Sequence, residues 1–463
     1  MHTNPESPSI PDTALRGTTA AVVLTLFLAA MDSTVVAVLL PEVDRALGHS
    51  DLYAWILSGY LIAVTLVAPF AGALGDRFGE RRMLQIAILL FATASGASAL
   101  APSMPELILA RVLQGLGGGM IIVLAYALLG TLYGPERRGS MQGMLSSVWG
   151  VAAVVGPLCG AALAAWLGWR AVFWLNLPLA VVCIAVLRLT DRDQTRTTHA
   201  VRIDIASQLL LGVITIGVML ALSQTTLRLP ATVFIVLLGF TTLAGLALVQ
   251  RAWRRPGASP IPTAFFSRPE LLSSLCLLFL SSGGLYGSVT LLPLYLQHGG
   301  TQIFGAAGTV ALAAVGWATG SAVCGKLLGR TGYRFAGLLG AALLIAGSVM
   351  LALHNSASSD LAIWGGEALL GFGTGFVATT SLVLAQNLAP AGHIGAYTAA
   401  TQFLRNLGAA VGINALAAMH LANSGLQGNA YHTAFVGLAV AMTLVVPLAL
   451  VLPQRYLALA EVG

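Results

Sequence analysis

The stretch "LFLAAMDSTVVAVLLP" (Leu26–Pro41) has a near copy further along the chain, "LFLSSGGLYGSVTLLP" (Leu278–Pro293). Both copies begin with LFL and end with LLP. Two more pairs follow at almost the same spacing: "GALGDRFG" (72–79) with "GKLLGRTG" (325–332), and "RVLQGLGGG" (111–119) with "EALLGFGTG" (367–375). Three matches in the same order, at offsets of 252, 253 and 256 residues, indicate a duplicated chain.

The composition places this duplication in a membrane. Of the 463 residues, 57% are hydrophobic and only 9% are charged, whereas a soluble domain carries about 25% charged residues. Apolar runs near the roughly 20 residues that cross a bilayer lie at 17–40, 53–74, 83–101, 106–131, 141–165, 170–188, 205–222, 231–250, 271–296, 304–328, 335–353, 361–386, 395–420 and 431–452. We therefore expect an all-α integral membrane protein with fourteen transmembrane helices.

The basic residues give the orientation. With the N-terminus in the cytoplasm, 18 of the 23 lysines and arginines fall on the cytoplasmic side, and only Arg45, Arg170 and Arg228 fall outside. Both termini are thus predicted in the cytoplasm, in a cell (inner) membrane. The basic loops are interpreted as orientation signals, and no nucleic-acid partner is expected. The four cysteines form no metal-ligand spacing, so neither a metal nor a cofactor is expected.

The repeats divide the chain into a six-helix bundle (1–189), a two-helix insert with cytoplasmic loops (190–270) and a second six-helix bundle (271–463). Duplicated halves around a site near the bilayer midplane are typical of secondary transporters. The sequence lacks the common hydrolase, metalloprotease and nucleotide-binding motifs, so an enzyme is not expected. The expected partners are a small-molecule substrate, protons and membrane lipid, and the expected assembly is a monomer.

Four ionisable residues lie inside the predicted spans: Asp32, Arg111, Glu367 and Arg405. A charge at such depth costs several kcal/mol and normally faces the protein interior. Asp32 and Arg111 lie at similar depths, ~12 Å and ~8 Å from the outer ends of their helices at ~1.5 Å per residue, so we expect them to meet. Burial and a neighbouring arginine act in opposite directions on a carboxylate. Asp32 is therefore a candidate proton carrier, and a static bridge with Arg111 is the alternative.

Glu367 occupies the place in the second half that Arg111 has in the first. It is a candidate second proton or cation site, and the alternatives are a partner for Arg405 or a carboxylate at the rim. In the fifth span, Pro157 permits a kink, and Gly150, Gly156 and Gly160 offer a smooth face for close packing. This pattern fits either a hinge or seal against leak or an ordinary bent helix.

Polar and aromatic residues of the spans are candidates for a substrate cavity, although each alone is equally compatible with packing. The set is Gln114, Tyr126, Trp149, Tyr286, Trp317, Gln402, Phe403, Arg405 and Asn406.

These motifs together resemble the fourteen-helix drug:proton antiporters of the major facilitator superfamily. "DSTVVAVLLP" (32–41) is similar to their first-helix motif, "GALGDRFGERR" (72–82) to the superfamily loop motif, and "RVLQG" (111–115) to the R-x-x-Q-G of helix 4. "GVAAVVGPLCG" (150–160) is similar to the exporter motif of helix 5, and "WRAVFWLNLP" (169–178) to the segment that follows it. The resemblance covers nearly the whole chain and implies the major facilitator fold of two six-helix bundles, here with two inserted helices.

The resemblance also implies roles for individual residues. Asp32 and Arg111 take part in proton coupling, and the loop motif with Gly72, Asp76, Arg77 and Gly79 latches the cytoplasmic side. Ala37 stands where the family usually has asparagine, and Glu80 replaces a basic residue. The first departure leaves the substrate range open, and the second weakens the expected latch.

The function expected from these observations is multidrug efflux by proton antiport, of an amphipathic compound that is cationic or aromatic, with antibiotic resistance as a consequence. A dedicated exporter of one self-made metabolite or antibiotic is the nearest alternative. A nutrient importer is disfavoured by the helix 5 motif, and a membrane enzyme or scaffold by the absence of catalytic motifs.

Overall fold

A computed structural model of the chain describes residues 12–48, 52, 55–190, 203–222, 230–255, 259–298, 303–354, 360–422 and 430–455. Within these ranges the regular structure is helical and no strand occurs. The helices are α1 (Asp12–Leu47), α2 (Trp55–Phe78), α3 (Glu80–Leu100), α4 (Met104–Leu132), α5 (Pro135–Leu167), α6 (Arg170–Leu189), α7 (Ile205–Leu222), α9 (Ala231–Arg254), α10 (Ala264–Ser267), α11 (Pro269–His298), α12 (Ile303–Leu353), α13 (Asp360–Asn387), α14 (Ile394–Ala422), α15 (Ala430–Thr443) and α16 (Val445–Val451).

The membrane-spanning helices agree with the sequence prediction. By length and hydropathy, 12 described helices can cross a membrane. Helix α12 has 51 residues and contains two of the expected spans, which meet at the non-helical Gly332. Helix α14 is more polar because it carries Gln402, Arg405 and Asn406, yet its 29 residues exceed the roughly 20 that are needed. With α12 counted as two spans, the described helices are long enough for all fourteen expected spans.

The duplication is visible in the backbone. Gly79 ends the turn between α2 and α3 with φ 89°, and its counterpart in the repeat, Gly332, has φ 79°. Only glycine adopts this left-handed conformation without strain, so the repeated glycines make the same turn in each half. Several helices extend beyond the predicted spans: α1, predicted over 17–40, continues to Leu47, and α5, predicted over 141–165, begins at Pro135.

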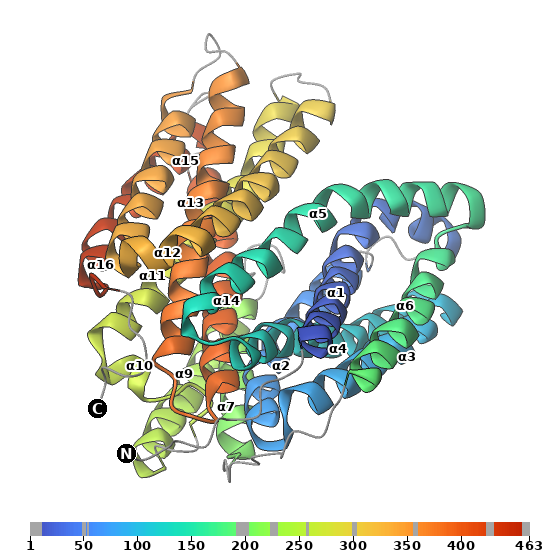
Figure 1. The fold of residues 1–463 in the computed structure, drawn as a ribbon. Coiled ribbons are helices and arrows are strands. Elements are labelled where there is room, and N and C mark those ends of the chain that lie inside the picture. The colour runs from blue at the N-terminus through green and yellow to red at the C-terminus, as the bar shows by residue number, and fades with distance from the viewer. Residues whose placement is uncertain are drawn as a thin grey trace, which may run out of the picture.

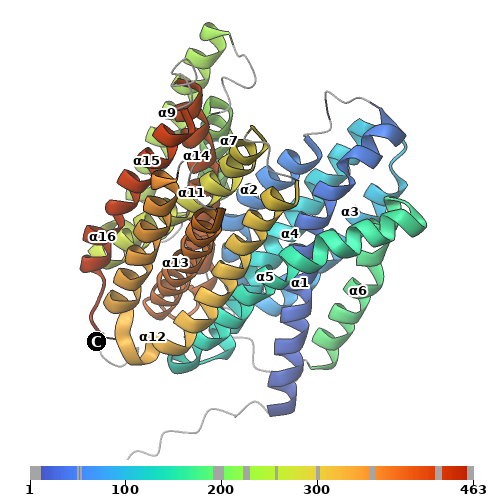
Figure 2. The same ribbon diagram turned by 90° about the horizontal axis from the view of Figure 1, so that it is seen from above.

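Each half has its own apolar core. One cluster of buried side chains extends from Phe265 to Leu452. Two others lie within residues 21–187, joined only by Leu382 and Ala399 from the second half. In Figures 1 and 2, α1–α6 and α11–α16 accordingly form two bundles side by side. The division into 1–189, 190–270 and 271–463 stays a prediction in its boundaries.

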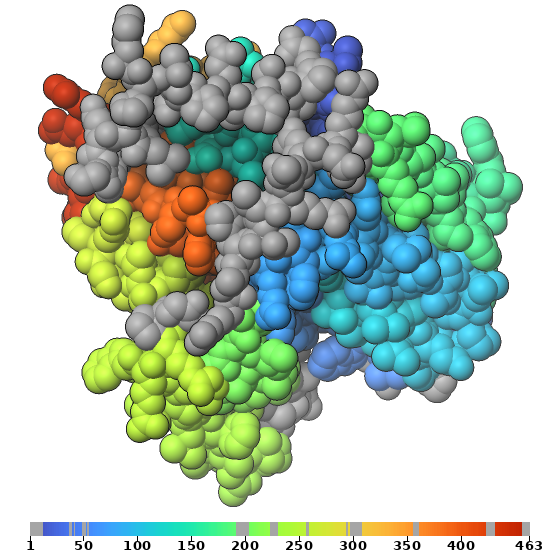
Figure 3. All heavy atoms as spheres, turned by 60° about the horizontal axis from the view of Figure 1, so that its bottom comes forward, coloured from blue at the N-terminus to red at the C-terminus, as the bar shows by residue number. Residues whose placement is uncertain are grey.

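The two inserted helices pack on each other at the edge of the bundles. Helix α7 contacts α9, where Thr241 lies directly against Gly217, and it also touches α2, where Leu66 lies near Gly212. In Figure 3 these two helices form a lobe below the other helices. The ion pair between Asp204 and Arg251 joins their ends, with 2.8 Å between Oδ1 and Nη2.

The arginines mark one end of the molecule. Arg16 and Arg137 lie near the starts of α1 and α5, and Arg77, Arg188 and Arg254 lie in the last turns of α2, α6 and α9. Because successive spans run in opposite directions, these arginines share one end of the molecule, which we call the basic end. Arg45 and Arg170 lie at the opposite end. Arg192, Arg196, Arg202 and Arg228 lie outside the described residues.

Candidate functional site

Asp32 lies at the centre of a buried polar cluster in the first half. Its Oδ2 accepts a hydrogen bond from Arg111 Nη1 at 2.6 Å, and both side chains are fully buried. Its Oδ1 accepts from Gln114 Nε2 at 2.9 Å and from Asn176 Nδ2 at 3.0 Å. The predicted meeting of Asp32 and Arg111 is therefore confirmed.

Local helix geometry explains this arrangement. Arg111 and Gln114 are three residues apart on α4, so they share one face, and Arg111 Nη1 also donates to Gln114 Oε1 at 2.9 Å. The Arg111 guanidinium lies over the ring of Tyr60 from α2, 4.3 Å from its centroid. Gln114 thus belongs to the Asp32 cluster, and its assignment to a substrate cavity stays a prediction.

The glycines of α5 face two different helices. A side chain at Gly160 would lie 2.6 Å from Val35, and one at Gly156 would collide with Thr34. Both neighbours lie on α1 within three residues of Asp32. Gly150 faces the other way, directly against Ala318 of α12. Helix α5 therefore connects the helix of Asp32 with the opposite half, as its course in Figure 1 shows.

At the basic end, Asp76 binds across the two halves. Its carboxylate accepts hydrogen bonds from the backbone N–H groups of Gly395 at 2.7 Å and Ala396 at 2.8 Å. These are the first residues of α14, where free N–H groups and the helix dipole attract an anion. Gly72, one turn earlier on α2, permits the approach, because a side chain there would lie 2.5 Å from Ala399. Arg77, also predicted in this latch, is exposed and lies over the ring of Phe78.

A second set of bonds joins the halves beside this latch. Arg138 is buried and donates to the carbonyl of Gln386 at 3.0 Å and to Asn387 Oδ1 at 2.9 Å. Gln142 Nε2 donates to Gln386 Oε1 at 2.8 Å. Close backbone contact between Gly139 and Gly325 continues the interface towards the centre. The basic end is thus closed in this structure.

Midway along the helices, aromatic rings from both halves surround Arg405. The rings of Trp149 on α5 and Trp317 on α12 are nearly parallel, at 8°, with centroids 6.5 Å apart. Arg405 Cζ lies 5.9 Å from the first ring and 5.6 Å from the second. Tyr286 meets Trp317 edge to face at 6.1 Å. Tyr126 and Gln402 border the same small cavity of about 10 Å³, roughly the room of one water molecule.

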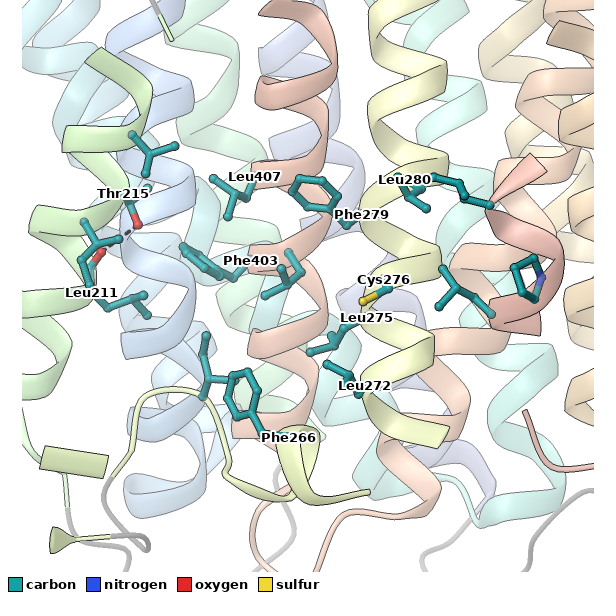
Figure 4. A pocket seen from close by; sticks show the side chains of 17 residues that line it. Leu211, Thr215, Phe266, Leu272, Leu275, Cys276, Phe279, Leu280, Phe403 and Leu407 are labelled. Carbon is teal, nitrogen blue, oxygen red and sulfur yellow. Dashed lines mark hydrogen bonds between the residues drawn. The ribbon is translucent and has the colours of Figure 1, made fainter. Parts of the chain in front are cut away.

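Phe403 points elsewhere. Residues 403 and 405 are about 200° apart around a helix, so Phe403 faces away from Arg405. It lines a larger apolar cavity of about 640 Å³ between α7 and α10, α11, α14 and α16. Figure 4 shows Leu211 and Thr215 of α7 on one side of this cavity and Leu275 and Phe279 of α11 on the other. Phe403 thus lies apart from Arg405, its assignment to a substrate cavity stays a prediction, and Asn406 is half-buried on the same helix.

Glu367 is fully buried in the second half, and neither carboxylate oxygen accepts a hydrogen bond from the described part of the chain. Ser288 of α11 interacts with it, although the Ser288 hydroxyl donates to the Leu285 carbonyl at 2.9 Å. Glu367 forms no ion pair with Arg405 in the described part of the chain. Two of its predicted alternatives, a rim carboxylate and a partner for Arg405, are therefore wrong.

Comparison with known proteins decides the family. A family model described as "Major Facilitator Superfamily" matches residues 22–413. The chain belongs to the major facilitator superfamily. The resemblance read from the sequence is thereby confirmed, and with it a transporter rather than an enzyme.

Relatives of the chain include proteins named as transporters. The multidrug transporter protein MdtP of Bacillus subtilis is 27% identical over 409 residues, 87% of this chain and 75% of that protein. The acurin A biosynthesis cluster MFS-type transporter of Aspergillus aculeatus is 30% identical, over 84% of this chain and 72% of that protein. Among solved structures, the human organic anion transporter MFSD10 matches with a TM-score of 0.69 at 18% identity, covering 94% of this chain and 99% of that one. This last likeness shows the major facilitator fold alone.

The sequence did not predict the contacts of two residues, Asn176 and Arg138. Asn176 stands in the quoted segment 169–178, yet its bond to Asp32 depends on how α6 packs against α1. Arg138 was counted only as an orientation signal, and its burial at 5% exposure shows that it serves the interface. The RR pair at 137–138 carries no signal that separates the buried arginine from the exposed one.

Proposed function

We propose that this transporter is a proton-coupled antiporter that exports amphipathic aromatic compounds across the cell membrane by alternating access, with its basic end in the cytoplasm. The observation that carries the proposal is the fully buried pair of Asp32 and Arg111 inside membrane-spanning helices. An ionisable residue at this depth is functional by default. A relative named as an efflux pump, the MFS-type efflux pump LUC4 of Fusarium sp, supports the direction of transport.

Protonation of Asp32 changes its cluster in a defined way. The carboxylate accepts hydrogen bonds from Arg111, Gln114 and Asn176, a set of three donors that suits the charged form. A proton on Asp32 removes the counter-charge of Arg111, whose Nε and Nη2 have no hydrogen-bond partner within the described ranges. Removing one partner of a buried pair costs roughly 3–5 kcal/mol. Proton loading therefore favours a rearrangement of α1 against α4.

Helix α5 transmits that rearrangement to the other half. Thr34, two residues after Asp32, donates to the Ala152 carbonyl of α5 at 3.1 Å. The same helix meets α12 through Gly150 and, nearer the basic end, Gly143 and Gly139. A shift of α1 is thus passed directly to the interface between the halves, and Gly150, Gly156, Pro157 and Gly160 act as its hinge and seal.

The bonds at the basic end act as the cytoplasmic gate. Asp76 on the start of α14 and Arg138 on the end of α13 hold this side closed, so the structure corresponds to a state that is shut towards the cytoplasm. Gly79 sets the turn that follows Asp76. Release of both contacts allows the halves to rock and expose Arg405 and the aromatic rings around it to the cytoplasm.

Glu367 is the second candidate proton carrier. A carboxylate that is fully buried and lacks a charged partner is held more easily in the protonated, neutral form. It lies seven residues into α13, as Arg111 does into α4, so the two halves place an ionisable group at equivalent depths. We propose that Glu367 exchanges its proton when the second half opens.

One proton per cycle is energetically sufficient for export. A proton entering across about 100 mV releases ~2.3 kcal/mol. Since ~1.36 kcal/mol corresponds to a factor of ten, this supports roughly a fiftyfold gradient of a neutral solute. A pH gradient adds to it.

A dedicated exporter of one self-made metabolite is the second candidate. It is favoured by the similarity to the acurin A biosynthesis cluster transporter, whereas the similarity to MdtP favours a multidrug pump. The two differ in breadth: a multidrug pump moves unrelated aromatic compounds, and a dedicated exporter moves only one.

Everted vesicles energised by a proton gradient test the antiport directly. Addition of the aromatic probes ethidium and naphthalene-2-sulfonate is expected to release protons through the wild type, compared with vesicles that lack the protein. Asp32→Asn should abolish this release, and Asp32→Glu, which keeps the carboxylate, should retain part of it. If neither probe moves protons, or if Asp32→Asn moves them as fast as the wild type, the proposed antiport is wrong.

A further inference from the structure

The cluster of Arg405 with the rings of Trp149 and Trp317, midway along the helices, carries a positive charge and is called the central cluster. Arg405 has 7% exposure and forms no ion pair in the described part of the chain. The cavity next to it is bordered by Tyr126, Ser146, Leu278, Trp317, Ala378, Leu382, Thr401 and Gln402, none of them acidic. A cation buried without a counter-charge is unfavourable, so this place in the transporter favours an anion.

The hydrogen-bond donors agree with the charge. Trp317 is 7% exposed, and its indole Nε1 has no hydrogen-bond acceptor among the residues that the structure describes. An unpaired buried donor is costly and rare in folded proteins. Arg405 adds the planar fork of a guanidinium, which binds carboxylates and similar oxyanions in a bidentate manner. Gln402 contributes one free acceptor, Oε1.

The rings supply the second element of recognition. Trp149 and Trp317 stack on each other at 8°, and their ring centroids lie 5.9 Å and 5.6 Å from the guanidinium carbon of Arg405. They come from different halves of the protein, so their contact changes when the halves rock. As they separate, each exposes a flat face on which a planar aromatic group can stack.

We infer that Trp149, Trp317, Gln402 and Arg405 form a binding site for aromatic anions, in which Arg405 holds the acidic group and the tryptophan rings hold the aromatic part. The inference rests on the proposed export function and names its substrate class. It replaces the cationic part of the sequence expectation, because the one charged side chain at the cluster is positive.

The substrate class determines how much charge one transport cycle moves across the membrane. Export of a monovalent anion in exchange for an entering proton moves two charges the same way across the membrane. Transport of such an anion is therefore expected to respond more steeply to an inside-negative potential than transport of a neutral analogue.

Three probes with one ring system test the inference: naphthalene-2-sulfonate, the neutral naphthalene-2-sulfonamide and the cationic 2-naphthyltrimethylammonium. Their binding to the purified full-length protein in nanodiscs is measured by calorimetry. The sulfonate is expected to bind at least about tenfold more tightly than either analogue, as for a charge-assisted contact. Arg405→Gln should abolish this preference, and Arg405→Lys should restore part of it. Trp317→Phe keeps an aromatic ring but lacks the N–H, and should weaken binding of the sulfonate more than binding of the ammonium.

A matched arginine provides the control. Arg170 lies over the ring of Trp169, 4.2 Å from its centroid, at the end of the molecule opposite the basic end and away from the proposed site. Arg170→Gln should therefore leave the affinities for all three probes unchanged. Equal affinity for the three probes, tighter binding of the ammonium, or an unchanged preference in Arg405→Gln with a wild-type melting temperature would overturn the inference. If ethidium drives proton release through Asp32 while the sulfonate does not bind, the anion site is wrong and the antiport stands. If the sulfonate binds through Arg405 but no probe moves protons, the site stands and the antiport is wrong.

Discussion

Substitution of Asp76 by asparagine should weaken the closure of the basic end. The carboxylate accepts from both Gly395 N and Ala396 N, and the amide of asparagine offers one oxygen and turns an N–H₂ group towards the second donor. A hydrogen bond to a charged group contributes ~1.5–3 kcal/mol, and a charge at a helix N-terminus ~0.3–1 kcal/mol. A loss of about 2 kcal/mol would shift the ratio of closed to open molecules roughly thirtyfold, at ~1.36 kcal/mol per tenfold.

The shift can be measured by cysteine labelling. Ser146 is 6% exposed and lies behind the gate, so Ser146→Cys reports opening when Cys159, Cys183, Cys276 and Cys324 are replaced by alanine. A membrane-impermeant maleimide applied to everted vesicles should label it at least tenfold faster in the Asp76→Asn background. Glu136→Gln, an exposed change at the same end, is the control and should have no effect. Equal labelling rates with Asp76 and with Asn at this position would refute the role of this contact.

Two further outcomes are expected. Gly156→Ala should cost ~1–3 kcal/mol of stability through overpacking against Thr34 and abolish transport. The control Gly239→Ala, with open space around it, should be neutral or stabilising. Equal melting temperatures of the two variants would contradict the packing of α5 on α1. At the insert, desolvation of Asp204 acts to raise its pKa. Hydrogen bonds from Ser207 and Arg251, together with the charge of the Arg251 guanidinium, outweigh this and lower the pKa of Asp204. A carboxylate with a lowered pKa in the folded state stabilises that state at neutral pH and loses this effect as the pH falls through that pKa. Asp204→Asn should therefore lower the melting temperature at pH 7 and leave it unchanged in acid. A loss of the same size at both pH values would contradict the stabilising role of the Asp204–Arg251 ion pair.

The sequence predicted the fold because a membrane limits the possible structures. Apolar runs, basic loops and the repeated glycines were enough to give fourteen spans and two equivalent halves, and Gly79 and Gly332 confirm the repeat at the level of φ angles. The pairing of Asp32 with Arg111 could be predicted from depth alone, because two opposite charges at similar depth in apolar helices have few other partners.

The remaining site residues depend on how helices rotate and pack. Gln114 and Phe403 were both assigned to the cavity by residue type, but α4 turns the first towards Asp32 and α14 turns the second towards α7. Glu367 and Arg405 share a half but not a contact, because Glu367 lies beside Ser288 of α11 while Arg405 faces Trp149 of the other half. Contacts between halves, such as that of Arg138 with Gln386, exist in one state of the transport cycle and leave no pattern in the sequence.

The protonation of Asp32 itself is the central claim, and infrared difference spectroscopy measures it most directly. Acidification of the reconstituted protein should produce a carboxylic acid C=O band that shifts in heavy water, is absent in Asp32→Asn and persists in Glu367→Gln. Such a result would identify Asp32 as a group that takes up the transported proton. A band that remains unchanged in Asp32→Asn would contradict the account and leave Asp32 and Arg111 as a static bridge.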